Sequence, residues 1–148
     1  MKKVSKSLSE TEKIAKEFVD FIVQSEGDGL SATLVGLHGD LGAGKTTFMK
    51  GVVKAFGIME EVTSPTYVIM KAYDLKHMKK SGRLVHIDAY RLEDPRELLN
   101  LGWKDIMENP ENIIFMEWPE KVAGILPDDM KKIHFKHIDE NTREIEIA

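Results

Sequence analysis

The first patterned stretch of the chain has a helical period. A helix with one buried stripe is expected there, because apolar residues recur at helical intervals at Ile14, Phe18, Phe21 and Ile22. Ser9 and Glu12 precede this stripe at the spacing of a capping box, which predicts that the helix begins there. A glycine-containing break at 27–29 then ends it.

Short apolar runs and helical stretches alternate along the rest of the chain. The segment 32–38 (ATLVGLH) is rich in strand formers and too short for a buried helix, and a second helix is expected from Lys45 to about Phe56. Asp94 and Pro95 begin another helical stretch, which ends near Pro110. The other predicted strands are 66–74, 83–90, 112–118, 132–138 and 143–148.

The order of these elements predicts an α/β fold. Strands that alternate with helices favour a central sheet flanked by helices. The basic segment 76–83 reads as a turn between two strands, and the turn DENT joins the last two strands into a hairpin. The sheet is therefore expected to be mixed, with parallel and antiparallel pairs, in a single domain that spans 1–148.

Composition narrows the classes of protein that this chain can represent. No stretch approaches the roughly 18 uncharged apolar residues of a membrane helix, and the N-terminus lacks a signal peptide's apolar core, so a cytoplasmic protein without membrane contact is expected. The absence of cysteine excludes disulfides, thiolate nucleophiles and sulfur-ligated metals. A formal net charge of -4 argues against nucleic-acid binding by this chain alone, so any RNA would need a basic partner.

The clearest chemical motif is GDLGAGKTT, which lies between a predicted strand and a predicted helix. Its glycines let backbone N–H groups converge on a phosphate, and the following helix adds the positive end of its dipole. Lys45 is expected to reach the β and γ phosphates of a nucleoside triphosphate, and the Thr46 hydroxyl to ligate Mg²⁺. The predicted nucleotide-binding residues are Gly39, Asp40, Leu41, Gly42, Ala43, Gly44, Lys45, Thr46 and Thr47.

Two acidic residues end predicted strands, and a metal-bound triphosphate needs such carboxylates. Asp88 ends the run LVHID, and Glu117 ends the run IIFME. In an open α/β sheet, ligands bind beyond the carboxyl ends of the strands, so both side chains are expected at one place. Either residue can orient Mg²⁺ through water or position the attacking water; the alternative is that each simply ends a strand in solvent.

Four blocks of sequence together resemble the TsaE family. GDLGAGKTT (39–47), TSPTY (63–67), HIDAYR (86–91) and EWPE (117–120) occur in that family's order and approximate spacing. The resemblance implies a P-loop NTPase fold and an ATPase that depends on Mg²⁺, weak alone and stimulated by its partners. It also implies a subunit of the bacterial system that makes threonylcarbamoyladenosine at position 37 of tRNA. TsaB and TsaD are then the partner subunits, and tRNA is met only indirectly through them.

The resemblance also suggests roles for individual residues. Lys45, Asp88 and Glu117 would be catalytic, with Asp88 tied to ATP hydrolysis and Glu117 associated with the metal together with Thr46. Thr66 lies where a switch-like segment could sense the γ-phosphate, although the start of a strand explains it equally well.

Further residues are candidates for contacts around this site. Tyr90, Arg91 and Trp118 are of the types that anchor protein interfaces, but Trp118 can also be a core residue and Arg91 can stabilise charge on the nucleotide. We interpret His86 as structural support for the Asp88 region rather than as a general base, because phosphoryl hydrolysis depends mostly on positioning and charge. By resemblance, Ser9 or Thr11 lies near the nucleotide base.

Three other functions fit a phosphate-binding loop less well. A small-molecule kinase commonly brings several arginines over the transferred phosphate, whereas this chain has only four in all, at 83, 91, 96 and 143, which counts against a kinase. A guanine-specific switch usually carries Asn-Lys-x-Asp, which is missing from the sequence. A nucleotide-gated adaptor, in which binding matters and turnover does not, stays open as an alternative.

Overall fold

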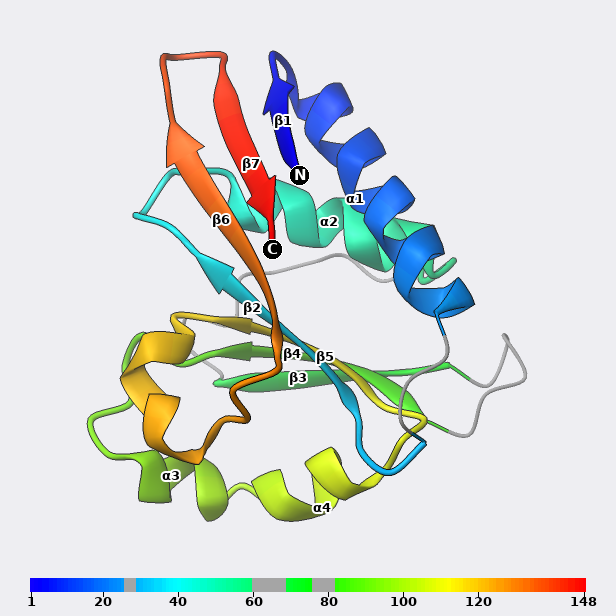
Figure 1. Cartoon of the computed structure of the whole chain (residues 1–148), viewed down its shortest axis with the longest axis vertical. Coiled ribbons are helices and arrows are strands. Elements are labelled where there is room, and N and C mark those ends of the chain that lie inside the picture. The colour runs from blue at the N-terminus through cyan, green and yellow to red at the C-terminus, as the bar shows by residue number, and fades with distance from the viewer. Residues whose placement is uncertain (26–28, 60–68, 76–81) are drawn as a thin grey trace. The chain divides into compact units, whose positions relative to one another are not determined.

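The computed structural model describes residues 1–25, 29–59, 69–75 and 82–148 (Figure 1). Its strands are β1 (Lys2–Ser5), β2 (Thr33–His38), β3 (Met70–Asp74), β4 (Arg83–Asp88), β5 (Ile113–Glu117), β6 (Lys131–His137) and β7 (Arg143–Ile147). Its helices are α1 (Leu8–Gln24), α2 (Lys45–Ala55), α3 (Pro95–Leu99), α4 (Trp103–Glu108) and the 3-10 helix η2 (Pro119–Ile125).

The strands form one mixed sheet in the order β1-β7-β6-β2-β5-β4-β3. β5 pairs in parallel with β2 and β4, whereas β3 with β4, β6 with β7 and β1 with β7 are antiparallel. The predicted α/β class, the mixed sheet and the C-terminal hairpin are therefore confirmed. Residues 76–81 of the predicted basic turn and residues 66–68 of the predicted strand 66–74 lie outside the described residues.

Contacts along the chain group its residues into two compact units, which we describe in turn. One comprises Met1–Glu26, His38–Ser64 and Ile133–Ala148, and the other comprises Gly27–Leu37 and Pro65–Lys132. The expectation of one domain over 1–148 stays a prediction. No helix in the described parts of either unit is long and apolar enough to cross a membrane.

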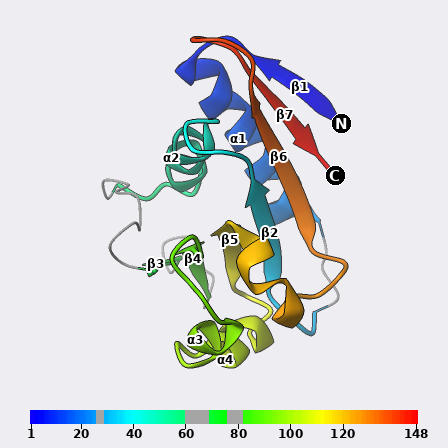
Figure 2. The ribbon, with the colours of Figure 1, turned by 90° about the vertical axis from the view of Figure 1, so that its left-hand side faces the viewer.

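In the first unit, α1 and α2 pack tightly against each other (Figure 1). Gly51 of α2 makes this approach possible, because a Cβ atom at that position would lie 2.8 Å from Ala15 Cβ and 2.9 Å from Glu12 Cα. Phe48 extends the packing, with its ring centroid 6.2 Å from that of Phe18 on α1 and 5.2 Å from that of Phe135 on β6. Figure 2 shows both helices on one side of the strands β1, β7 and β6.

The start of α1 differs from the prediction. Ser7 is the N-cap, and its side chain accepts a hydrogen bond from Glu10 N at 3.1 Å, while Glu10 Oε2 accepts one from Lys6 N at 2.6 Å. The predicted capping box at Ser9 and Glu12 is therefore wrong by two residues, because a serine with the same spacing to a glutamate lies just upstream.

The buried face of α1 also differs in one residue. Ile14, Phe18 and Ile22 are buried as predicted, but Phe21 is 58% exposed. The buried face is completed by Ala15 and Val19 on its other side, which leaves Phe21 at its edge.

The Ser7 cap leads to a prediction about stability. Replacing Ser7 by alanine leaves the N–H of Glu10 without its acceptor and is expected to cost about 1 kcal/mol of unfolding free energy. Ser9→Ala is the matched control and is expected to be nearly neutral, because Ser9 lies inside the helix and is exposed. Urea unfolding followed by circular dichroism measures both variants. An equal loss in the two would contradict this assignment of the cap.

In the second unit, one face of the strands packs against α3, α4 and η2. Figure 1 shows α3 and α4 on the same side of β3, β4 and β5. The apolar core of this unit is formed by Ala32, Leu34, Val85, Ile87, Ala89, Leu92, Leu98, Trp103, Ile114, Met116 and Val122. The opposite face of the same strands therefore presents the alternate residues, which include His86, Asp88 and Glu117.

The helical stretch predicted from Asp94 to Pro110 is two helices. Asp94 caps α3 by accepting a hydrogen bond from Arg96 N at 2.9 Å. The pKa of the Asp94 carboxyl is lowered, most by its hydrogen bond with the Arg96 side chain and next by this backbone hydrogen bond. The helix ends at Leu99, and after a short turn Gly102, whose φ of 87° is left-handed, precedes the first residue of α4. The break lets both Leu98 and Trp103 enter the core.

Candidate active site

The glycine loop 39–44 joins β2 to α2, so the predicted order of strand, loop and helix is confirmed. Gly39 has a φ of 152°, and a Cβ atom there would lie 2.7 Å from Phe135 O on β6. Gly44 has a φ of 108° and is the N-cap of α2, where it supplies no side-chain hydrogen bond. The loop thus passes close to β6 and leaves the N-terminus of α2 without a side-chain cap, which is the arrangement in which a helix binds an anion.

Lys45 lies across this loop. It is the first residue of α2 and only 5% exposed, and its Nζ donates a hydrogen bond to Gly39 O at 2.5 Å. Ala43 is also buried and donates its N–H to Asp40 O at 3.1 Å, whereas Leu41, Gly42 and Thr46 are exposed. The structure therefore places a buried ammonium group against the backbone of the turn, in a loop that also contains exposed residues.

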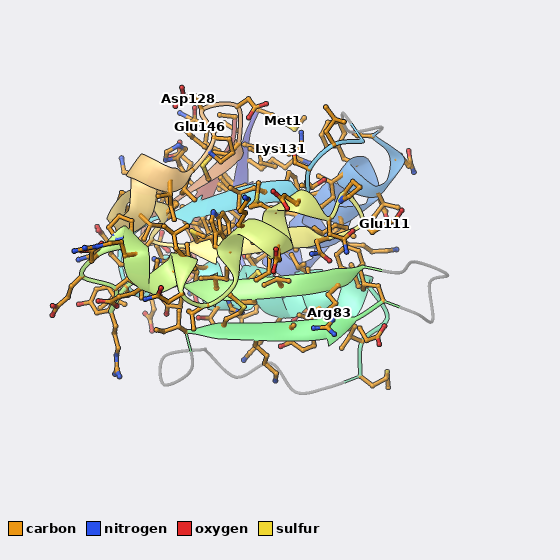
Figure 3. The ribbon with its side chains drawn as sticks, turned by 90° about the horizontal axis from the view of Figure 1, so that it is seen from below. Met1, Arg83, Glu111, Asp128, Lys131 and Glu146 are labelled. Carbon is orange, nitrogen blue, oxygen red and sulfur yellow. The ribbon has the colours of Figure 1, made fainter. Side chains whose placement is uncertain are left out.

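The two predicted carboxylates lie side by side on the second unit. Asp88 and Glu117 are paired in register at the ends of the parallel strands β4 and β5. Arg83 and Glu111 mark the beginning of these strands (Figure 3), so the acidic residues lie at the opposite, carboxyl end. Glu117 is also in register with Leu37 of β2, and the glycine loop begins two residues after Leu37.

The environments of the two carboxylates differ. Glu117 is 5% exposed, whereas Asp88 is half-buried and its Oδ1 accepts a hydrogen bond from Tyr90 N at 3.0 Å. Sequence spacing leaves the roles of these two residues open, and burial separates them: the Glu117 carboxylate is enclosed, and Asp88 is the one that solvent can reach.

His86 makes its hydrogen bond to Glu117, the residue that is paired in register with Asp88. Its Nε2 lies 2.8 Å from Glu117 Oε2, and both side chains are buried. The sequence places His86 two residues before Asp88 on the same face of β4, which suggests support for the Asp88 region. The hydrogen bond instead runs diagonally to β5, and only the register of the two parallel strands reveals it.

Aromatic residues follow both carboxylates along the chain. The ring centroids of Tyr90 and Trp118 are 5.2 Å apart, and Lys121 Nζ lies 5.8 Å from the centroid of Tyr90. Trp118 is partly buried against the core of its unit, so the core interpretation is correct in part, whereas Tyr90 and Arg91 are exposed. Trp118 also has a left-handed φ of 57°, which is uncommon for a residue with a side chain.

Three further residues are candidates from the sequence: Thr66, Ser9 and Thr11. Thr66 and the block TSPTY are outside the described residues. Ser9 is exposed on the first turn of α1, and Thr11 is buried with its Oγ1 2.7 Å from Ser5 Oγ. Arg143, to which the sequence assigns no role, lies beside the loop: a Cβ atom at Gly44 would be 3.6 Å from Arg143 Cγ.

Comparison with known proteins decides the family. Residues 5–145 match the family described as "Threonylcarbamoyl adenosine biosynthesis protein TsaE". The chain belongs to the TsaE family. Its resemblance to TsaE at four short blocks is thus confirmed over nearly the whole sequence.

Individual TsaE proteins agree with this assignment. The tRNA threonylcarbamoyladenosine biosynthesis protein TsaE of Haemophilus influenzae is 35% identical over 136 residues, which cover 91% of this chain and 80% of that protein. The protein of the same name from Bacillus subtilis is 38% identical over 136 residues, or 92% of this chain and 77% of its own. The crystal structure of Bacillus subtilis YdiB superposes with a TM-score of 0.73 at 28% identity, covering 99% of this chain and 83% of that one.

The side chains of this TsaE protein suit a metal that is shared with a phosphate. Among the described residues, no group of three or more His, Asp or Glu is arranged to hold a metal ion by itself. Mg²⁺ is usually bound through one or two carboxylates together with substrate phosphates and water. The buried Glu117 carboxylate beside Asp88 fits that mode and does not fit a metal site built from protein alone.

Proposed function

We propose that this TsaE protein is a cytoplasmic Mg²⁺-dependent ATPase that drives the modification of tRNA to threonylcarbamoyladenosine together with TsaB and TsaD. The observation that carries the proposal is the buried Lys45 ammonium inside the uncapped turn between β2 and α2. Its net charge of -4 favours a role in which tRNA is bound by the partners.

The turn would bind the phosphates of ATP mainly through its backbone. In this proposal, the N–H groups from Gly39 to Thr47 surround the phosphates, and Lys45 exchanges its bond to Gly39 O for bonds to the β and γ phosphates. The first turn of α2 adds the positive end of the helix dipole, which no side-chain cap neutralises because the N-cap is Gly44. These contacts stabilise a triphosphate without requiring further cationic residues.

The carboxylates would divide the remaining work. Thr46 and Glu117 would hold Mg²⁺, which when bound neutralises charge on the β and γ phosphates. Asp88 would position the attacking water, because it is the more accessible of the two and the Tyr90 N–H fixes one of its oxygens. A strong general base is not needed, because phosphoryl transfer depends mostly on positioning and charge.

The contacts of the described arginines do not favour the alternative of a small-molecule kinase. Arg96 is bound to Asp94 through three side-chain contacts of 2.8–3.2 Å, and Arg143 donates to the backbone carbonyls of Asp139 and Thr142. Two of the four arginines are thus already used in local structure. Phosphate transfer from ATP to a nucleoside or sugar by the isolated protein would restore the kinase alternative.

The Tyr90–Trp118 pair is the surface that we propose for partner contact, with Arg91 beside it. Tyr90 side-chain atoms are available to a partner, while its backbone N–H holds Asp88, so a partner at Tyr90 would act close to the proposed catalytic carboxylate. Tyrosine, tryptophan and arginine are the residues that dominate binding energy in protein interfaces.

Tyr90→Ala is expected to lower partner-stimulated ATP turnover about tenfold, with little change in unstimulated turnover, because loss of an interface anchor costs about 1–2 kcal/mol. Ile138→Ala is the matched control, since Ile138 is 47% exposed against 46% for Tyr90 and lies in the β6–β7 turn. Turnover is measured with and without TsaB and TsaD. Full stimulation of Tyr90→Ala would show that the contact surface lies elsewhere.

Reconstitution tests the proposed function as a whole. The purified chain is combined with TsaB, TsaD and tRNA, and ATP hydrolysis and adenosine modification are followed together. We expect weak hydrolysis by the isolated chain, faster hydrolysis in the mixture, and modification that stops when this chain is omitted. Modification supported by a variant that binds ATP without hydrolysing it would favour the nucleotide-gated adaptor.

A further inference from the structure

The buried hydrogen bond between His86 and Glu117 lies beside the proposed metal site. We propose that His86 is a positioning residue that fixes the Glu117 carboxylate, so that Oε2 stays bound to the imidazole and Oε1 serves the cation. This inference rests on the proposed function. In it, His86 acts only through Glu117 and does not contact the nucleotide. His86 is 1% exposed, so its ring is held by packing on β4 as well as by this bond.

The register of β4 and β5 explains why such a support is needed. Asp88 and Glu117 are directly opposite each other, and neighbouring strands are about 4.8 Å apart, so two negative charges would face each other at close range. Each carboxylate is instead bound by a separate donor. Tyr90 N holds Asp88, and His86 holds Glu117 from two residues further back along β4.

The chemistry of the pair fixes the direction of the hydrogen bond. A metal ligand is an ionised carboxylate, which only accepts hydrogen bonds, so in the proposed role Nε2 of His86 carries the hydrogen and donates it to Glu117 Oε2. Nδ1 of His86 has no hydrogen-bond partner within residues 1–25, 29–59, 69–75 and 82–148. Among the described residues, the imidazole of His86 therefore makes its hydrogen bond to Glu117, through Nε2.

Positioning of this kind has a measurable effect on metal binding. Removing the partner of a metal ligand typically weakens metal affinity about 10–100-fold while the ligand itself stays in place. In this protein, loss of the His86 donor would free the Glu117 carboxylate to leave this orientation, and the Mg²⁺-dependent part of ATP affinity would fall. The affinity for ATP without Mg²⁺ would be unchanged, because His86 lies on a different element from the glycine loop.

The experiment titrates Mg²⁺ into protein mixed with a fluorescent ATP analogue, with EDTA as the starting point. His86→Phe keeps a ring but removes the donor, and we expect it to need about tenfold more Mg²⁺ for the same tightening of analogue binding. His86→Gln places an N–H donor near the position of Nε2 and is expected to respond like the wild type. The double variant His86→Phe with Glu117→Gln is expected to be no weaker than Glu117→Gln alone, because both changes act on one ligand.

The outcomes separate this inference from the function on which it rests. A Mg²⁺ response of His86→Phe equal to the wild type, or additive losses in the double variant, would overturn the positioning role alone. A wild-type protein that binds the analogue with no response to Mg²⁺ would overturn both. If His86→Phe does not fold, His86→Asn replaces it in the experiment. The asparagine amide is too short to reach Glu117, so this variant is expected to lose the Mg²⁺ response that His86→Gln keeps.

Discussion

Lys45→Ala is expected to weaken ATP binding about 100-fold or more, because the buried ammonium contributes charge-assisted hydrogen bonds worth about 1.5–3 kcal/mol each. The loss should be nearly the same with and without Mg²⁺, since the proposed contact of Lys45 is with the phosphates themselves. Calorimetric titration with ATP measures the change, and a thermal melt shows that the variant is folded.

A second lysine of α2 provides the control for this prediction. Lys50 is exposed on the same helix, and Lys50→Ala is expected to bind ATP within about twofold of the wild type because exposed charges are screened by solvent. Similar losses in the two variants would mean that net positive charge, rather than the ammonium inside the turn, governs binding. Unchanged affinity in Lys45→Ala would place the nucleotide away from the glycine loop.

Asp88→Asn is expected to bind ATP within about threefold of the wild type but to hydrolyse it about 100- to 1,000-fold more slowly, as is typical when one electrostatic contact to the reacting groups is removed. Asparagine retains an oxygen that accepts the N–H of Tyr90, so the turn after β4 is preserved. What is lost is the negative charge that positions the attacking water. Single-turnover hydrolysis with the partners present measures the effect.

The control for this variant is an acidic residue outside the site. Asp105 lies exposed on the first turn of α4, and Asp105→Asn is expected to leave hydrolysis unchanged. tRNA modification by Asp88→Asn then distinguishes two functions. The ATPase proposal predicts that modification fails, whereas an adaptor that needs only bound nucleotide would support it at the rate of the wild type.

The local elements of this fold could be predicted from the sequence because their signals are local. The loop 39–44 lies between β2 and α2 as its glycine pattern predicts, and the hairpin of β6 and β7 follows from alternation around the turn DENT. Propensity alone also gave the three strands whose ends carry His38, Asp88 and Glu117, since each is a short run of strand formers.

Features that depend on distant partners could not be predicted. β1 has Val4 exposed and Ser5 buried, so its sequence has no apolar alternation, and it is a strand because it pairs with Arg143–Ile147 at the other end of the chain. The exposure of Phe21 follows from which side of α1 meets α2. The His86–Glu117 bond follows from the register of two parallel strands that are separated by α3 and α4 in the sequence.

A crystal structure with Mg²⁺ and a non-hydrolysable ATP analogue tests whether the glycine loop binds the nucleotide and Glu117 the cation. We expect the β and γ phosphates inside the turn from Gly39 to Thr46, in contact with Lys45, and the cation bound by Thr46 and Glu117. An analogue bound away from this turn, or a cation whose ligands include neither Glu117 nor Asp88, would contradict this proposal.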